Sequence, residues 1–211
     1  MHGLKIEFWY EFASTYSYLA AMRIEALAGA AGVPVEWKPF LLGPIFQAQG
    51  WTTSPFIIYP AKGRYMVRDM ERIAGERGLE FQMPEPFPQN GLAAARVALV
   101  GAEAGWIGAF SREVYRSAFA MGADISRRET LVEALRRVDE MLGHDADRIL
   151  ARSGEAGVKE RLKEQTALAQ NLGIFGAPTF RVAKPSGEDA GELFWGDDRL
   201  EQAIAWALAG R

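Results

Sequence analysis

Hydrophobic and polar residues alternate at the start of the chain and then change to a helical spacing. Residues 4–10, LKIEFWY, alternate and are rich in β-forming side chains, which predicts a strand. Residues 16–31 carry apolar side chains at helical spacing and precede Gly32, which predicts a helix. A second strand follows at 35–42, where Pro39 makes it an edge strand or ends it early. This β-α-β order predicts a parallel pair of strands.

The middle of the chain lacks this alternation. From about Gly43 to Leu92 the sequence is rich in glycine and proline, with one clear helix at 63–78. From Leu92 to about Gln170, amphipathic stretches separated by breakers predict a region that is almost entirely helical.

Strand patterns return near the end of the chain. Residues 178–182 and 192–196 have the composition of strands, and residues 183–191 between them predict a polar, hairpin-like turn. Residues 197–210 predict a last helix with an aspartate at its N-cap.

These elements predict an α/β fold whose main domain is divided in the sequence. Residues 1–43 and 171–211 are expected to form that domain, and residues 44–170 a helical domain inserted between its halves. The length of 211 residues and the balance of 49% apolar and 24% charged residues are ordinary for a globular protein.

Net charge and residue counts exclude several functions. The net charge is −3 without a basic block, which argues against nucleic-acid binding, and no apolar run has the length of a membrane span. The N-terminal sequence lacks the pattern of a secretory signal. The chain has no cysteine, so it has no disulfide and no thiol nucleophile of its own, which suits a reducing cytoplasm. With two histidines, a histidine triad or a metal site is not expected.

Hydroxyl-bearing residues cluster at the junction between the first predicted strand and the first predicted helix, beginning with Ser14. A lone serine at such a junction most often caps free N–H groups of the helix. The same hydroxyl can donate to a thiolate held over the helix start, where the helix dipole favours negative charge. Because the protein has no cysteine, such a thiol has to come from a ligand.

Two segments near the C-terminus are further candidates. Gly176-Ala177-Pro178 suggests a forced turn, for which a plain loop with a trans proline is the commoner outcome. If Pro178 is cis, the Ala177 backbone faces outward and can pair with an extended peptide ligand. Capping of the last helix is sufficient to account for Asp197 and Asp198. The alternative is that one of these carboxylates binds the α-ammonium group of a ligand.

Two charged residues in the middle of the chain are weaker candidates. Lys62 and Asp69 lie in the segment YPAKGRYMVRD, where a basic residue can neutralise a ligand carboxylate, although a solvated charge at a helix end is the more frequent outcome.

The order of these segments resembles a known family. A strand ending in EFASTYSYLA, an insertion containing PAKGRYM and DISRRETL, and then GIFGAPTF and FWGDDRLE resemble the 2-hydroxychromene-2-carboxylate isomerases. Kappa-class glutathione transferases are close relatives, and disulfide oxidoreductases of the DsbA type share the fold. The resemblance covers essentially the whole chain and implies a thioredoxin-like fold with a large helical insertion.

The resemblance implies a glutathione enzyme. Ser14 matches the catalytic serine, Pro178 the cis-proline, and Ala177 the residue whose backbone pairs with the cysteinyl unit of glutathione. Asp197 and Asp198 fall where the relatives bind the γ-glutamyl end.

Lys62 and Asp69 match the ligand cleft of the kappa relatives. The chain departs from its relatives at Thr15, where they usually have proline, and at Thr53, where they often have asparagine before two prolines. Without that proline the helix start is looser but the Ser14 hydroxyl stays in place, and Thr53 stands where the relatives make one glutathione contact.

The family's reaction interconverts 2-hydroxychromene-2-carboxylate and trans-o-hydroxybenzylidenepyruvate in aromatic catabolism, by thiolate addition, bond rotation and elimination. The resemblance also implies a homodimer. The alternatives are a kappa-type glutathione transferase at the same site and a non-catalytic binding module that kept the fold. A disulfide oxidoreductase is excluded because the chain has no cysteine.

Overall fold

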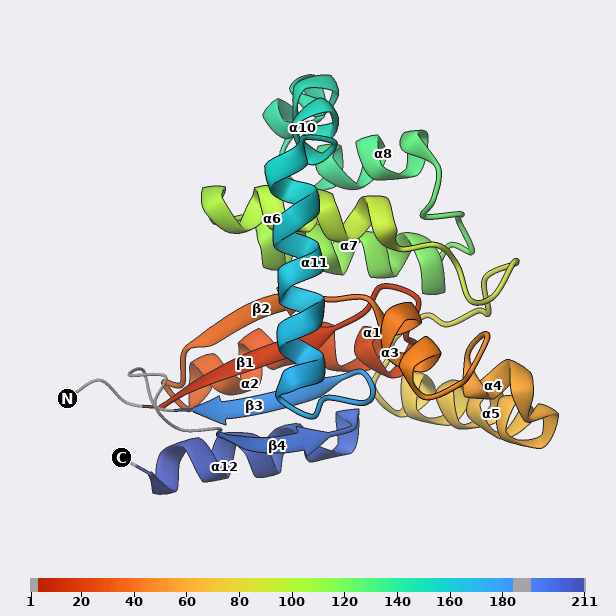
Figure 1. Cartoon of the computed structure of the whole chain (residues 1–211), viewed down its shortest axis with the longest axis vertical. Coiled ribbons are helices and arrows are strands. Elements are labelled where there is room, and N and C mark those ends of the chain that lie inside the picture. Colours follow the sequence, from red (N-terminus) through yellow and green to blue (C-terminus); the bar gives the residue numbers. More distant parts are fainter. Residues whose placement is uncertain (1–3, 184–190, 211) are drawn as a thin grey trace.

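A four-stranded mixed sheet lies at the centre of the structure, a computed structural model that describes residues 4–183 and 191–210 (Figure 1). The strand order is β2-β1-β3-β4. The strands are β1 (Lys5–Tyr10), β2 (Val35–Pro39), β3 (Thr179–Ala183) and β4 (Glu192–Trp195). β1 pairs parallel with β2 and antiparallel with β3, which pairs antiparallel with β4. The two ends of the sequence therefore share one sheet, as predicted.

The alternation in β1 places apolar side chains on both faces of the sheet. Ile6, Phe8 and Tyr10 are fully buried in the main core, and Trp9 is fully buried in a second core around Phe40. A strand buried on both faces belongs in the middle of a sheet. β2 lies at the edge of the sheet and ends at Pro39, as the sequence predicts.

Three helices and a short 3₁₀ turn flank the sheet. They are α1 (Thr15–Ala21), α2 (Ile24–Ala30), η1 (Asp197–Arg199) and α12 (Leu200–Ala209). The single helix predicted over residues 16–31 is wrong, because the helix breaks at Met22–Arg23. The predicted aspartate cap of the last helix is also wrong: both aspartates belong to η1, and Arg199 precedes α12.

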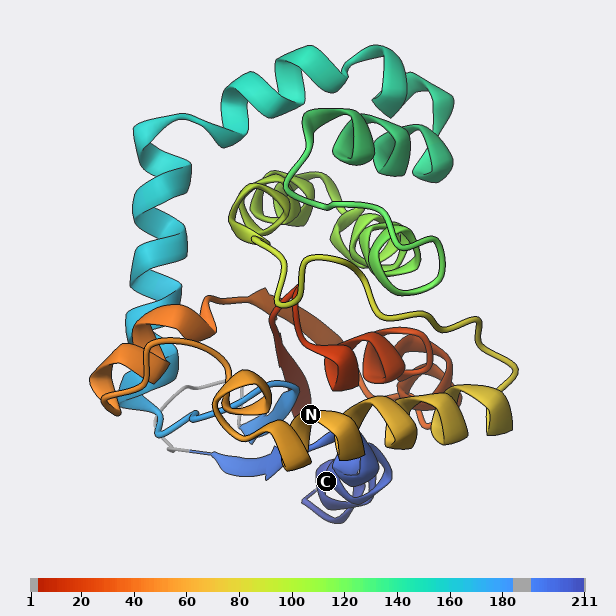
Figure 2. The same ribbon diagram turned by 90° about the vertical axis from the view of Figure 1, so that its right-hand side faces the viewer.

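The remaining helices lie between β2 and β3 in the sequence. They are α3 (Leu42–Ala48), α4 (Pro55–Ile58), α5 (Pro60–Glu76), α6 (Leu92–Ala104), α7 (Ile107–Phe119), α8 (Arg128–Val138), α9 (Glu140–His144), α10 (Ala146–Ser153) and α11 (Ala156–Asn171). The region with one predicted helix therefore holds three, of which α3 and α4 are short. Figure 2 shows α6, α7 and α8 stacked on one side of α1, with α5 on its other side.

The main core is continuous between the sheet and the inserted helices. Tyr10 and Phe12 pack on Tyr115 of α7, and the Tyr10 hydroxyl is 2.7 Å from the Ser111 Oγ. Tyr18 of α1 stacks on Phe119. Since these rings bury both regions together, the division into two domains stays a prediction.

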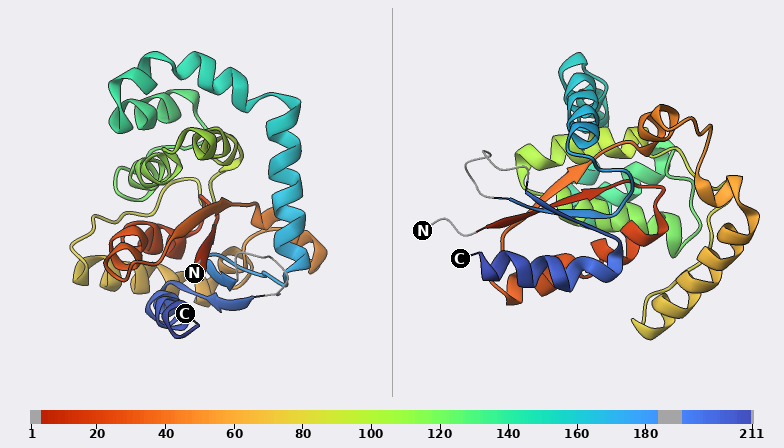
Figure 3. Two further views of the ribbon diagram at one scale, coloured as in Figure 1. Left: turned by 90° about the vertical axis from the view of Figure 1, so that its left-hand side faces the viewer. Right: turned by 60° about the horizontal axis from the view of Figure 1, so that its bottom comes forward.

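The two ends of the described chain lie side by side. The end of α12 lies near the start of β1 (Figure 3). Gly210 lies close to the Leu4 side chain. The predicted turn at 183–191 falls mostly on residues 184–190, which are outside the described residues. Within 4–183 and 191–210, no helix combines the length and apolar character that crossing a membrane requires.

Candidate active site

Ser14 sits at the N-cap of α1. Its Oγ accepts a hydrogen bond of 3.2 Å from the Ser17 N–H, and its own N–H donates 3.0 Å to the Glu11 carbonyl. The capping role expected for a serine at this junction is confirmed. Ser14 remains partly exposed, so its hydroxyl is also available at the surface.

The Ser14 hydroxyl also reaches the other half of the sequence. It donates 3.0 Å to the carbonyl oxygen of Ala177, which is 163 positions further along the chain. The Ala177–Pro178 peptide bond is cis. The Pro178 carbonyl in turn accepts 2.9 Å from the Gly196 N–H. The start of α1, the loop before β3 and the turn after β4 therefore meet at one place.

The backbone of Ala177 is only partly engaged. Its carbonyl accepts from Ser14, whereas its N–H has no hydrogen-bond partner among the described residues. Ala177 is partly exposed. A free N–H beside a carbonyl with a second lone pair is the pattern that an extended peptide ligand can pair with.

Gly176 allows this loop to lie against β4. A Cβ at Gly176 would come within 2.5 Å of the Trp195 indole nitrogen, so a larger residue cannot fit without moving Trp195. Trp195 and Phe175 are about half exposed and their ring centroids are 4.9 Å apart. An aromatic pair therefore stands beside the Ala177 backbone.

The two aspartates after β4 occupy different environments. The Asp197 side chain is 3% exposed, and its two carboxylate oxygens accept from Arg23 Nε at 3.2 Å and from an Arg77 guanidinium nitrogen at 2.7 Å. The Asp198 side chain is 75% exposed and has a distant partner in Arg199, at 3.7 Å. Asp197 is therefore saturated by arginines, while Asp198 is free to meet a ligand cation.

Asp69 is linked to α1 through a tyrosine that the sequence did not single out for a role. The Tyr16 hydroxyl donates 2.9 Å to the Asp69 carboxylate, which also pairs with Arg72 at 3.0 Å. Partial burial, and next the bond to Asp69, raise the pKa of the Tyr16 hydroxyl above its ordinary range. This contact ties the middle of α5 to the helix that starts at Ser14.

Lys62 lies at the periphery of the predicted site residues. It is exposed near the start of α5, and its Nζ lies 5.7 Å from the centroid of the Tyr59 ring. Seven positions separate it from Asp69, or about 10 Å along the same helix face. The structure thus brings together Ser14, Ala177, Pro178 and the turn at Asp197–Asp198, with Asp69 one contact away and Lys62 at the periphery.

Glu11 is a titratable residue at this site that the sequence did not reveal. It lies between β1 and Ser14, and its Oε2 accepts 2.9 Å from the Ala13 N–H. Burial raises the pKa of the Glu11 carboxyl to about 7, and the bond from Ala13 offsets part of that rise. The available signal was an acidic residue directly after a buried strand, but its surroundings depend on segments far away in the sequence.

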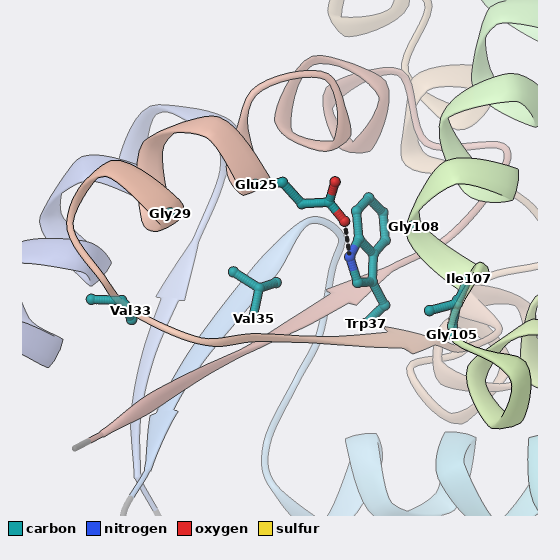
Figure 4. Close-up of a pocket in the computed structure, with 8 residues that line it drawn as sticks. All are labelled: Glu25, Gly29, Val33, Val35, Trp37, Gly105, Ile107 and Gly108. Carbon is teal, nitrogen blue, oxygen red and sulfur yellow. Dashed lines mark hydrogen bonds between the residues drawn. The ribbon is translucent and has the colours of Figure 1, made fainter. Parts of the chain in front are cut away.

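A surface hollow of about 360 Å³ lies elsewhere, between α2, β2 and the turn from α6 to α7 (Figure 4). Within it, the Glu25 carboxylate accepts 3.0 Å from the Trp37 indole N–H. The lining residues are Glu25, Gly29, Val33, Val35, Trp37, Gly105, Ile107 and Gly108. None of the predicted site residues lines this hollow, so it is separate from the place where Ser14 and Ala177 meet.

Known proteins similar to this chain match it along nearly its whole length. The model of the DSBA-like thioredoxin domain matches residues 5–205. A 2-hydroxychromene-2-carboxylate isomerase of Sphingobium xenophagum is 30% identical over 206 residues, which cover 96% of this chain and 97% of that protein. Glutathione S-transferase kappa 2 of Caenorhabditis elegans is 26% identical over 208 residues, covering 93% of this chain and 88% of that protein.

Solved structures agree with this assignment at the level of the fold. A selenomethionine structure of 2-hydroxychromene-2-carboxylate isomerase superposes with a TM-score of 0.80 at 24% identity, covering 97% of this chain and 94% of that chain. The mixed sheet, the helical insertion and the sequence matches lead to one conclusion. The chain belongs to the family of DSBA-like thioredoxin domains, in the group that includes the 2-hydroxychromene-2-carboxylate isomerases and the kappa glutathione transferases.

Proposed function

We propose that this chain is a glutathione-dependent isomerase that interconverts 2-hydroxychromene-2-carboxylate and trans-o-hydroxybenzylidenepyruvate. The observation that carries the proposal is the Ser14 hydroxyl on the Ala177 carbonyl, next to the unpaired Ala177 N–H. The chain has no cysteine, so a reactive thiol at this place has to be brought by a small molecule. Relatives named isomerase and glutathione transferase support this choice.

The residues present fit glutathione, which is itself a short peptide. The Ala177 N–H and carbonyl are placed to pair with the cysteinyl unit, as a strand pairs with a sheet edge. Asp198 is exposed and free to bind the α-ammonium group of the γ-glutamyl end. Asp197, already held by two arginines, is proposed to fix the turn that presents Asp198.

Two further residues complete the proposed ligand site. Lys62 neutralises a terminal carboxylate of glutathione. Asp69 holds Tyr16, and with it the first turn of α1, in position.

The protein's task in this reaction is to hold a sulfur in its ionised form. The Ser14 O–H turns from the Ala177 carbonyl to the sulfur and donates to it, while the free N–H groups of the first helical turn face the same negative charge. When bound, glutathione supplies the thiolate that adds to the conjugated carbon of the substrate and leaves again after the ring has opened and the bond has rotated. No oxidant or reductant is consumed.

Replacement of Ser14 tests the proposal. We expect Ser14→Ala to lower isomerase turnover by roughly tenfold to a thousandfold, because one donor to a developing charge is lost. Ser14→Ala also removes the N-cap of α1 at a cost of about 1 kcal/mol, whereas Ser14→Gly costs only a few tenths. If both variants lose the same turnover but different amounts of stability, the loss of turnover is due to the missing hydroxyl. Wild-type turnover in either variant contradicts the proposed role of Ser14.

A second candidate is a transferase at the same site, which the kappa relative favours. Turnover of the chromene carboxylate and of chlorodinitrobenzene, compared by kcat/KM at saturating glutathione, separates the two activities. A non-catalytic module predicts no heat of glutathione binding in a calorimeter. The homodimer remains a prediction from the resemblance, and light scattering of the purified protein tests it. The cytoplasmic location remains a prediction from the lack of cysteine.

A further inference from the structure

Glu11 builds the turn that carries Ser14, and the proposed reaction gives it no task. Its carbonyl accepts 3.0 Å from the Ser14 N–H and 3.0 Å from the Tyr115 hydroxyl of α7. Its carboxylate folds back onto the Ala13 N–H at 2.9 Å. The backbone carbonyl and the side-chain carboxylate of Glu11 therefore both bond to the segment that positions Ser14, and the carbonyl also bonds to α7 packed against it.

The carboxyl is packed against the start of α6. A Cβ at Gly91 would lie 3.2 Å from the Glu11 Oε1 and 2.9 Å from the Phe12 Cβ, so glycine is needed for this approach. The titratable neighbours are tyrosines: Tyr115 on α7 bonds to the Glu11 carbonyl, and Tyr10 on β1 bonds to Ser111.

Among the described residues, no cation forms an ion pair with this carboxyl. α6 presents Gly91 to it, and Arg96 one turn further on forms no ion pair with it. The first four residues of α1 bear hydroxyl groups, and none of its residues is charged at neutral pH. Within residues 4–183 and 191–210 the Glu11 carboxylate therefore has a hydrogen bond but no salt bridge.

We propose that Glu11 is a positioning residue whose ionisation weakens the thiolate held at Ser14, so that the site works best with Glu11 neutral. This inference rests on the proposed function, since the thiolate is that of bound glutathione. The raised pKa of Glu11, about 7, means that the carboxyl changes charge in the range where an enzyme of this kind operates.

Distance sets the size of the effect. Glu11 bonds to Ala13, the neighbour of Ser14, so the carboxylate and a sulfur beside the Ser14 hydroxyl are separated by roughly 8–12 Å. Two negative charges at that distance in a partly buried site repel enough to shift each ionisation roughly twofold to tenfold. Coupling of this kind is reciprocal, so a bound thiolate must raise the pKa of Glu11 by the same factor.

Titration of Glu11 in the wild-type protein is the direct test. The side-chain carboxyl is followed by ¹³C NMR against pH, in the protein alone, with glutathione and with S-methylglutathione, which has no ionisable sulfur. We expect glutathione to raise the Glu11 pKa, which corresponds to a twofold to tenfold decrease in the ionisation constant of this carboxyl. We expect S-methylglutathione to leave the pKa unchanged. Equal titration with both ligands overturns the inference.

The Glu11→Gln variant gives an independent measurement. Glutamine keeps an oxygen acceptor for the Ala13 N–H but carries no charge. We expect the ratio of variant to wild-type turnover to rise twofold to tenfold between about pH 5.5 and about pH 8. A ratio that is the same at both pH values indicates a purely structural role and also overturns the inference. Glu164→Gln, on the exposed face of α11, is the matched control and should change nothing.

Calorimetry separates this inference from the function on which it rests. If glutathione binds but Glu11 titrates independently of its sulfur, the inference fails while the proposed site stands. If glutathione does not bind, both fail together. The NMR titration uses the wild-type chain, so a folding defect in Glu11→Gln does not remove the test.

Discussion

Single residues at this site carry two tasks at once, and Ser14 is the clearest case. Its hydroxyl accepts from the Ser17 N–H and donates to the Ala177 carbonyl. The same group therefore caps the start of α1 and joins two segments that are distant in the sequence. Capping, the ordinary explanation for such a serine, therefore does not compete with a catalytic role. A hydroxyl can satisfy both because it has one proton to donate and two lone pairs to accept.

Glu11 predicts an unusual pH dependence of stability. Its folded pKa of about 7 lies above the ordinary value of 4.5 for a glutamate, so the folded protein binds this proton more tightly than the unfolded chain. Its contribution is therefore most favourable below about pH 4.5 and is lost as pH rises toward 7.

Because part of the Glu11 residue remains accessible to water, we expect a loss of about 1 to 3 kcal/mol over that range. In urea unfolding, Glu11→Gln should gain stability relative to wild type at about pH 8 but not at about pH 4. A constant difference between the two proteins across this range contradicts the assignment.

At the scale of elements, the turn after β4 depends on a partly buried ionic cluster centred on Asp197. Asp197 is held by Arg23 at the break between α1 and α2 and by Arg77 at the end of α5. Arg23 also bonds to the Asp197 carbonyl at 2.6 Å and pairs with Glu201 of α12. The Asp197 carboxylate therefore connects three segments that are separate in the sequence, and Arg23 extends the cluster to α12.

The two neighbouring aspartates should respond differently to the same substitution. We expect Asp197→Asn to lower the free energy of unfolding by about 2 to 4 kcal/mol, because it removes the buried negative charge that Arg23 and Arg77 share. Asp198→Asn should change stability by less than about 0.5 kcal/mol and weaken glutathione binding, as measured by calorimetry. A reversed pattern would show that Asp197, rather than Asp198, meets the ligand.

At the scale of the whole molecule, the aromatic core joins the sheet to the inserted helices. Tyr10, Phe12 and Tyr18 contact Tyr115 and Phe119 across the boundary between the two predicted domains. Rings buried on both sides of a boundary lose their contacts if either side unfolds alone, which couples the stability of the two parts.

This continuity predicts one cooperative unfolding transition. Tryptophan fluorescence and far-ultraviolet circular dichroism should give the same midpoint in urea, because neither region keeps a complete core without the other. Tyr115→Phe, which removes the hydroxyl bond to the Glu11 carbonyl, should lower that midpoint without splitting the transition. Two separate midpoints in the wild-type protein would instead support independent domains.

Local pattern determined much of this protein. The alternation of β1, the edge position of β2, the helical middle and the capping serine all follow from side chains and their near neighbours. The absence of cysteine excluded redox chemistry by the chain's own thiols. These features can be predicted because strand periodicity, helix periodicity and capping depend on residues that are close together in the sequence.

Tertiary structure determined the features that depend on contacts between residues far apart in the sequence. Ser14 and Ala177 are 163 positions apart, and only the antiparallel pairing of β1 with β3 brings them together. Asp197 and Asp198 are identical in sequence terms, yet one points inward to two arginines and the other to solvent. The pKa of Glu11 likewise depends on burial by segments far away along the chain. A residue's type and its neighbours in sequence specify its chemistry, but burial and long-range contacts set how that chemistry is used.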